Sequence, residues 1–349
     1  MAAAEVEPYI AVALQTTCRA VNRLDDAATR AAMLAAIDRI GGQIRGARAF
    51  IGPDARLFVL PEYFLTGFPM GDAIDAWAQK AALAIDGPEY AALGRLASDN
   101  GIFIAGNAYE IDDAFPGLYF QTSFLVDDGG SVALRYRRLV SMYTPTPHDV
   151  WDKYLDLYGI DGVFPVADTA LGRIAAIASE EILYPEIARA LALRGAELFV
   201  HSTSEIGSPE LTPKDIAKRA RALENLAYVV SANSAGIEGI SIPEQSTDGM
   251  SKLVDFRGRV MAEAGYGETI VAQGEIDIAA LRRYRRRPGM GNMLSRQRLE
   301  LFAGVYGGTP VYPANSLLEA GGGHRIPERE HFSGMQRDAI QRLLDDGVI

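Results

Sequence analysis

The sequence of 349 residues contains one cysteine and only four histidines, and both shortages exclude kinds of site. A single cysteine, Cys18, cannot form a disulfide within the chain and cannot build a cysteine-based zinc site. No HExxH signature occurs either, so we expect neither a metal nor a cofactor. Cys18 follows the first predicted strand, and we interpret it as a semi-buried structural thiol.

Long apolar runs and an excess of positive charge are also missing. No run approaches the roughly 20 apolar residues of a membrane span, and the N-terminus lacks the basic and apolar regions of a signal peptide. A formal charge of −11 disfavours nucleic acid and anionic membranes as partners. We therefore expect a cytoplasmic protein that acts on a small-molecule substrate. A local basic cluster, interpreted as a contact within the chain or between subunits, comprises Arg282, Arg283, Arg285, Arg286 and Arg287.

Apolar strand patterns alternate with helical patterns along most of the chain. Strands are predicted at 9–15, 56–62, 102–109, 120–127, 131–138, 172–181, 196–202 and 227–233, and helices at 25–48, 88–99, 185–194 and 213–226. A last hairpin is predicted to pair 250–256 with 269–277. This alternation predicts mixed sheets covered by helices, and two such halves packed sheet on sheet would form an α-β-β-α sandwich.

The pattern changes near Pro288 to segments rich in glycine, proline and asparagine, with a short final helix near 334–344. We predict one domain over 1–287. We expect the C-terminal extension, 288–349, to pack on this core or on a neighbouring subunit.

Three of the predicted strands end on polar side chains. Glu62 ends the apolar run RLFVLPE, where partial desolvation would raise the pKa of its carboxyl and suit it to general base work. An equally good local interpretation is a glutamate that caps the next segment. Ser179 ends GRIAAIA just before a helix, where helix amides can stabilise an oxyanion, although a helix-capping serine is the simpler interpretation. Arg138, taken alone, is typical of a solvated charge at a strand end.

The order of these three strand ends along the chain is itself informative. LPEYFLTGFP, ALRYRRL and IAAIASEEILYPEIARALALRGAELFVHST resemble, in sequence, the three catalytic segments of the nitrilase, or carbon–nitrogen hydrolase, superfamily. RARALENLAYVVSANSAG and DFRGRVMAEAGYGETIVAQGEIDIAALRRYRRR resemble two later blocks. The resemblance runs from about Tyr9 to Arg287. It implies a four-layer α-β-β-α sandwich that forms a homodimer through its helical face, or a larger homo-oligomer.

The resemblance also implies a catalytic triad of glutamate, lysine and cysteine. Position by position, Glu62 matches the general base, Arg138 replaces the lysine and Ser179 replaces the cysteine. A guanidinium can donate to an oxyanion but cannot shuttle protons. A serine hydroxyl ionises far less readily than a thiol and needs a base held against it, and here a carboxylate would have to serve.

Further polar residues lie near these segments. The second glutamate of many superfamily members has no clear match, and the loop over 141–165 offers His148, Asp149 and Asp152, of which we favour Asp149. His201 either lines the cavity or, as we favour, is a buried structural histidine. The auxiliary residues are thus predicted to be Asp149, Glu180, Glu181 and His201.

Two functions fit these features. The first is an enzyme that hydrolyses a small amide-like substrate or transfers its acyl group. The second is a catalytically silent homologue that binds a ligand or scaffolds a partner. Retention of Glu62 and of the Ser-Glu-Glu sequence at 179–181 favours the enzyme. The glycine-rich segments 289–294 and 321–323 lack the preceding strand of a nucleotide-binding motif and are predicted to be loops.

Overall fold

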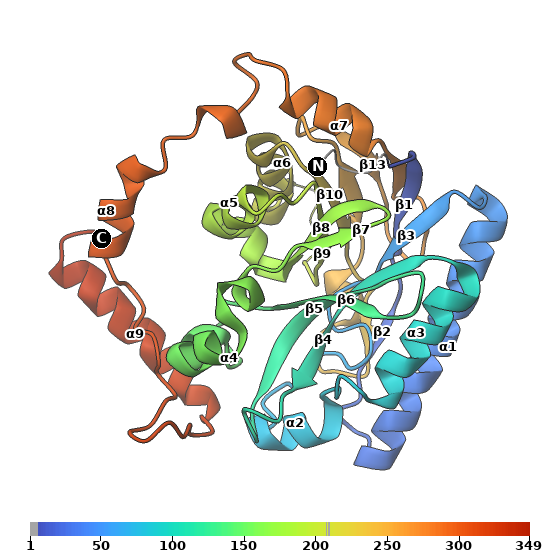
Figure 1. Ribbon diagram of the computed structural model, residues 1–349. Coiled ribbons are helices and arrows are strands. Elements are labelled where there is room, and N and C mark those ends of the chain that lie inside the picture. The colour runs from blue at the N-terminus through green and yellow to red at the C-terminus, as the bar shows by residue number, and fades with distance from the viewer. Residues whose placement is uncertain (1–5, 207, 209) are drawn as a thin grey trace.

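Two six-stranded mixed sheets lie face to face in the computed structural model, which describes residues 6–206, 208 and 210–349 (Figure 1). The first sheet has the order β14 (Gln273–Ile276), β1 (Tyr9–Ala13), β3 (Ala55–Val59), β4 (Phe103–Ile111), β5 (Tyr119–Val126) and β6 (Val132–Arg137). The second has the order β13 (Val260–Glu263), β12 (Lys252–Val254), β10 (Tyr228–Ala232), β9 (Leu198–Ser202), β8 (Gly172–Ala178) and β7 (Ala167–Thr169). The central strands of each sheet are parallel and the flanking strands antiparallel.

Helices cover the outer face of each sheet, so the layers run α-β-β-α as predicted (Figure 1). On the first sheet lie α1 (Asp26–Ile51), α2 (Ile74–Ala81) and α3 (Pro88–Asn100), and on the second lie α5 (Pro185–Leu193) and α6 (Pro213–Asn225). The Asp25 side chain caps α1 by accepting from the Ala28 amide, and the buried stripe that includes Met33, Ile37 and Ile40 packs inward. Buried apolar side chains of both sheets form the central core.

One predicted strand pairing is wrong. The turn at Arg257-Gly258 is present, but it joins β12 to the adjacent β13, with Leu253 opposite Ala262. The segment predicted as the hairpin partner, β14, instead pairs antiparallel with β1 in the other sheet. A tight turn brings together the residues nearest to it in sequence, which leaves the later strand free to close the first sheet beside β1.

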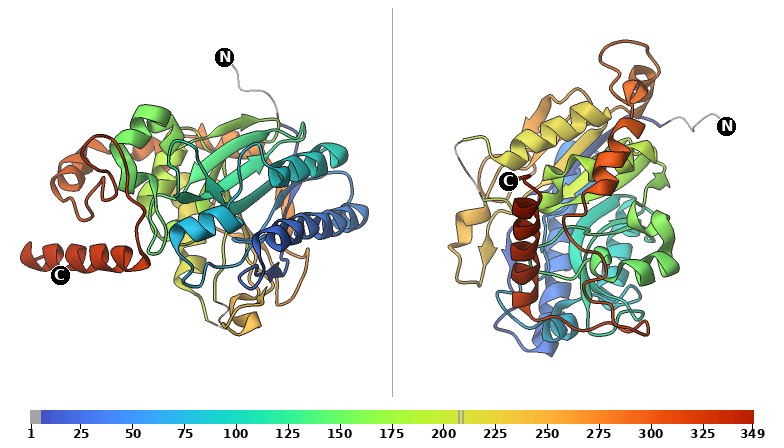
Figure 2. Two further views of the ribbon diagram at one scale, coloured as in Figure 1. Left: turned by 90° about the horizontal axis from the view of Figure 1, so that it is seen from below. Right: turned by 90° about the vertical axis from the view of Figure 1, so that its left-hand side faces the viewer.

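The loop predicted over 141–165 contains two helical segments, η1 (Pro147–Val150) and α4 (Trp151–Val163). Beyond α7 (Ile278–Arg285), the C-terminal segment carries η4 (Leu294–Arg296), α8 (Glu300–Gly308) and α9 (Arg329–Asp345), the last longer than predicted. Figure 2 shows α9 extending beyond the sandwich. Its first turn is attached to the core, because Phe332 is buried in a cluster with Trp77, Tyr154 and Leu317 of the preceding segment.

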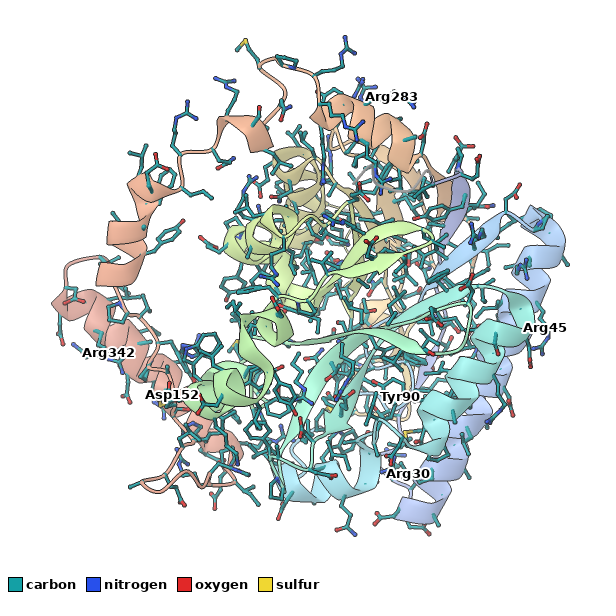
Figure 3. All side chains as sticks on the ribbon, in the orientation of Figure 1. Arg30, Arg45, Tyr90, Asp152, Arg283 and Arg342 are labelled. Carbon is teal, nitrogen blue, oxygen red and sulfur yellow. The ribbon has the colours of Figure 1, made fainter. Side chains whose placement is uncertain are left out.

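The basic cluster lies on and after α7 and makes contacts within the chain, one of the two interpretations considered. Arg282 Nε lies 2.6 Å from a carboxylate oxygen of Glu197. Arg285 donates to the carbonyl oxygen of Leu226 at 2.9 Å. Arg283 points outward from α7 (Figure 3). Within the described residues, no helix has the length and apolar character to cross a membrane.

Candidate functional site

Three strand ends from the two sheets meet at one cavity of about 610 Å³. Glu62 follows β3 and Arg138 follows β6 in the first sheet, while Ser179 follows β8 in the second. The sheets pack face to face at these strands. The charged and hydroxyl side chains that line the cavity include Glu62, Arg138, Ser179, Glu180 and Lys214.

Glu62 is buried at the floor of this cavity, with 2 % of its surface exposed. Its Oε1 accepts a hydrogen bond of 2.5 Å from Gln121 Nε2 and lies 3.6 Å from Arg138 Nη1. The Gln121 Oε1 atom accepts from the same Nη1 at 2.7 Å. Gln121 therefore bridges the carboxylate and the guanidinium and fixes both side chains relative to β5.

The Arg138 guanidinium is held on several sides. Its Nε donates to the Val140 carbonyl at 2.6 Å, and its Nη2 pairs closely with the Glu180 carboxylate. Burial lowers the pKa of Arg138, but neighbouring groups that include Tyr63, Glu180 and Glu62 outweigh burial and raise it. The side chain is therefore a permanent positive charge in the cavity wall.

Ser179 lies on a strained turn between β8 and η2 (Ser179–Leu183). Its φ of 47° is in the left-handed region, which non-glycine residues rarely adopt. His201 supports the turn from the core, because its Nε2 lies 2.8 Å from the Ser179 carbonyl oxygen and its Nδ1 lies 2.8 Å from Ser231 Oγ. Burial holds the pKa of His201 well below its usual value. The structure thus brings His201 to the backbone of Ser179 rather than to its hydroxyl.

The two glutamates after Ser179 point in different directions. Glu180 faces the cavity and Arg138. Glu181 is fully buried and accepts from Tyr136 Oη at 2.7 Å and from the Leu139 amide at 2.7 Å. Burial raises the pKa of Glu181 to about 7, although Arg138 and these hydrogen bonds oppose the shift. Glu181 therefore links the turn at Ser179, here called the serine turn, to the segment that carries Arg138.

Asp149 lies apart from the described residues that line the cavity. Its carboxylate accepts from the Thr146 amide at 2.9 Å and from Thr146 Oγ1 at 2.8 Å, which closes a capping box at the start of η1. It also accepts from Ser316 Oγ of the C-terminal segment at 2.6 Å. These contacts hold the chain between β6 and α4 against the C-terminal segment.

The sequence reasoning missed Lys214, the second residue of α6. Its Nζ donates to Ser179 Oγ at 3.2 Å and to Thr203 Oγ1 at 3.1 Å. A capping box between Thr212 and Asp215 fixes the first turn of α6 and so the direction of Lys214. A signal was present, because a lysine in the first turn of a helix opposes the helix dipole and is unfavourable unless something else requires it.

Cys18 lies in a short strand, β2 (Cys18–Arg19), that pairs with β11 (Ile237–Glu238). It is fully buried and does not line the cavity, as far as the described residues show. Its Sγ lies 3.7 Å from the Glu62 carbonyl oxygen. Burial raises the pKa of the thiol to about 12, so the thiol is protonated near neutral pH.

Aromatic rings form another wall of the cavity. Tyr63 stacks on Tyr109 with ring centroids 5.0 Å apart, and Phe68 meets Tyr63 edge-on at 5.0 Å. Arg329, at the start of α9, also lines the cavity and donates to the Asp72 carbonyl oxygen at 2.6 Å. The cavity thus joins a charged floor to an apolar wall, an arrangement that suits a small ligand with a polar reacting group. No described cluster of histidine, cysteine and acidic side chains could hold a metal ion.

Comparison with known proteins gives one family. The model of the family described as carbon-nitrogen hydrolase matches residues 10–286. The chain is 28% identical over 307 residues to a formamidase of Pseudomonas syringae pv. tomato, covering 87% of this chain and 84% of that one. It is 31% identical over 250 residues to a protein of Pseudomonas protegens named hydrolase in pqqF 5′region, covering 71% and 80%. Among solved structures, Saccharomyces cerevisiae Nit3, a member of branch 10 of the nitrilase superfamily, shares the fold, with a TM-score of 0.64, 20% identity and coverage of 85% and 99%.

Proposed function

Because the chain belongs to the carbon-nitrogen hydrolase family, we propose that it hydrolyses a small amide, or transfers its acyl group, at a site made of Glu62, Arg138 and Ser179. Ser179 occupies the position of the family's cysteine and Arg138 that of its lysine. The convergence of these three strand ends on one cavity is the observation that supports this proposal. The formamidases among the relatives support a small amide as the substrate class.

The proposed chemistry uses each group at the atom it presents. Ser179 Oγ attacks the amide carbon, and the left-handed turn holds this oxygen toward the cavity. Arg138 stabilises the negative charge that develops on the amide oxygen. The proton that Ser179 gives up ends on the amide nitrogen, which leaves as ammonia, and water then hydrolyses the acyl-serine ester and restores the hydroxyl. Glu62 is the base for that water, and in a variant without a covalent intermediate it would activate water directly.

Ammonia release from formamide, acetamide and propionamide tests the proposal. Wild type should turn over at least one of these amides, and Ser179→Ala and Glu62→Gln should each lower kcat about 100-fold or more. Cys18→Ala is the matched control, because this buried thiol lies outside the described cavity lining. It should leave kcat unchanged.

The possible results separate the alternatives. If Cys18→Ala loses turnover and Ser179→Ala retains it, the nucleophile is the Cys18 thiol and not the Ser179 hydroxyl. Turnover without any mass increase on the protein would favour direct water activation by Glu62. If neither wild type nor Glu62→Gln releases ammonia from any of the amides faster than the uncatalysed reaction does, the result would favour a catalytically silent, ligand-binding homologue.

We also propose that the chain forms a homodimer or larger homo-oligomer through its helical face and its C-terminal extension. Large apolar side chains are exposed on α5 and α6, among them Leu193 at 50% and Ile216 at 59%. The face of α8 is similarly apolar, with Phe302 and Val305 exposed at 50% and 67%. Light scattering on the purified protein tests this, and a monomer at micromolar concentration would contradict it.

A further inference from the structure

We propose that Lys214, in its neutral form, is the base that accepts the hydroxyl proton of Ser179, so that the site works as a serine–lysine pair. This inference rests on the proposed role of Ser179 as nucleophile. It supplies the proton acceptor that a serine requires and that a cysteine thiolate does not.

The position of Lys214 matches this role. Its Nζ lies 3.2 Å from Ser179 Oγ, within reach for direct proton transfer. A second hydroxyl, Thr203 Oγ1, lies 3.1 Å from the same nitrogen. A neutral amine has one lone pair and two N–H donors. If one N–H donates to Thr203, the lone pair can face the Ser179 hydroxyl.

Within the described part of the chain Lys214 has no carboxylate counter-ion, unlike the lysine one turn later on the same helix. Lys218 Nζ lies 2.7 Å from a carboxylate oxygen of Glu205 and 3.5 Å from one of Asp215. Lys214 forms no ion pair with a carboxylate of the described residues, and its two partners are neutral hydroxyls. A lysine shielded from water without a paired carboxylate loses its proton more readily than an exposed one.

The surrounding charges act in both directions on Lys214. Burial has the largest effect and lowers its pKa. The carboxylates of Glu62 and Glu205 oppose this, whereas the cations Lys218 and Arg138 reinforce it. The net pKa of Lys214 is lowered, and its place at the positive end of the helix dipole acts in the same direction.

The other basic groups near Ser179 are already engaged elsewhere. The ring nitrogens of His201 contact the Ser179 carbonyl oxygen and Ser231. Among the described residues, the Glu62 carboxylate accepts from Gln121 and lies beside Arg138 rather than against the serine hydroxyl. The base predicted from the sequence, a carboxylate, is therefore directed to a different part of the cavity.

The proposed step balances in atoms and charge. As Ser179 Oγ bonds to the amide carbon, its proton moves to the Lys214 nitrogen and the carbonyl electron pair moves onto oxygen. The ammonium of Lys214 then donates that proton to the departing nitrogen as the carbon–nitrogen bond breaks. This leaves an acyl-serine and a neutral lysine, and no further reactant is needed until water arrives.

Acylation by p-nitrophenyl acetate tests the pair. The rate is measured from p-nitrophenolate release between pH 6 and 10, and the acetylated residue is found by peptide mapping. Wild type should acquire an acetyl group on Ser179, with a rate that rises as Lys214 loses its proton. Lys214→Met and Lys214→Arg should each slow acylation of Ser179 about 100-fold or more. The arginine variant keeps the charge but cannot act as a base, so it separates proton transfer from electrostatic support.

Two further variants make the result specific. Lys80→Met is the matched control, because Lys80 is also partly buried and donates to a neutral oxygen, the Asn22 carbonyl at 2.8 Å, away from the cavity. It should acylate like wild type. Lys214→Cys treated with 2-bromoethylamine regains an amine of lower pKa, and Cys18, the other cysteine, is buried. Acylation should return with its pH profile moved to lower pH.

The outcomes distinguish this inference from the proposed function. If Lys214→Met and Lys214→Arg acylate Ser179 as fast as wild type, or if alkylation of Lys214→Cys restores nothing, the lysine is not the base although the serine remains the nucleophile. If wild type is not acylated on Ser179 at all, the proposed role of Ser179 fails and the pair fails with it. Slow acylation in both lysine variants with rescue by alkylation supports the pair.

Discussion

Replacing Arg138 with methionine is expected to leave the Glu62 carboxylate buried without its nearest cation. The two side chains are 8% and 3% exposed, with Nη1 and Oε1 3.6 Å apart. Arg138→Met should therefore destabilise the fold strongly. Adding Glu62→Gln should restore part of the lost stability, because the unpaired buried charge is then removed.

The geometry sets the size of this effect. At 3.6 Å and an effective dielectric constant of about 20, the attraction between the charges is about 5 kcal/mol. Desolvation of both groups offsets part of it, so removing one partner should cost about 3–5 kcal/mol. Glu180 also loses its partner, but its side chain is 33% exposed, so this loss should add less than about 1 kcal/mol. We expect a coupling energy between Glu62 and Arg138 of about 2–4 kcal/mol.

Urea unfolding at a fixed protein concentration measures this coupling. The four proteins of the cycle are wild type, Arg138→Met, Glu62→Gln and the double variant, followed by tryptophan fluorescence. Trp77 is fully buried and reports the loss of the core. Additive free energies, within about 0.5 kcal/mol, would refute the idea that the two charges depend on each other.

Three further predictions concern single positions. A Cβ on Gly94 would lie 2.5 Å from the Gly130 carbonyl oxygen, so Gly94→Ala should lower stability by about 2 kcal/mol in spite of better helix propensity. A Cβ on Gly42 would meet nothing within 4 Å, so Gly42→Ala should raise stability by up to about 1 kcal/mol. Thermal unfolding of the two variants measures the sign of each change. Ser179→Gly and Ser179→Ala should both lose activity, but the glycine variant should be more stable by about 1 kcal/mol because of the φ of 47°; equal stability in urea would argue against backbone strain. The Glu181 carboxyl, with its pKa raised from 4.5 to about 7, holds its proton more tightly in the folded state, so its contribution to stability falls as pH rises through this range. The stability of Glu181→Gln relative to wild type should therefore increase by up to about 3 kcal/mol between these pH values, and a pH-independent difference would contradict the shift.

The local sequence pattern was sufficient to predict the helices and strands that have a periodic or continuous run of apolar residues. The apolar stripe of α1 and the apolar runs of β3 and β8 predicted those elements to within a few residues. The same runs placed Glu62 and Ser179 at strand ends, because a buried strand that stops at a polar residue delivers that residue to the edge of the sheet. The order of the five blocks that resemble the family was then sufficient to predict the family and its four-layer sandwich.

Pairings and contacts between distant segments depended on the tertiary structure. The strand β14 has the same local pattern whether it pairs with β12 or with β1, and only the closing of the first sheet decides between them. Asp149 was favoured by its place in a loop, but its carboxylate is used for a helix cap and for Ser316, 167 residues away. Periodicity describes one segment at a time and contains no information on such partners.

Lys214 shows the same division most clearly. The resemblance of the sequence to the family led us to propose that Ser179 takes the place of the family's cysteine, and a serine nucleophile needs a base. The sequence by itself also placed Lys214 at the start of a helix, where a positive charge is unfavourable. Only the packing of α6 against the serine turn brought the amine to 3.2 Å from Ser179 Oγ, because that distance joins residues from two separate elements that meet in the folded protein alone.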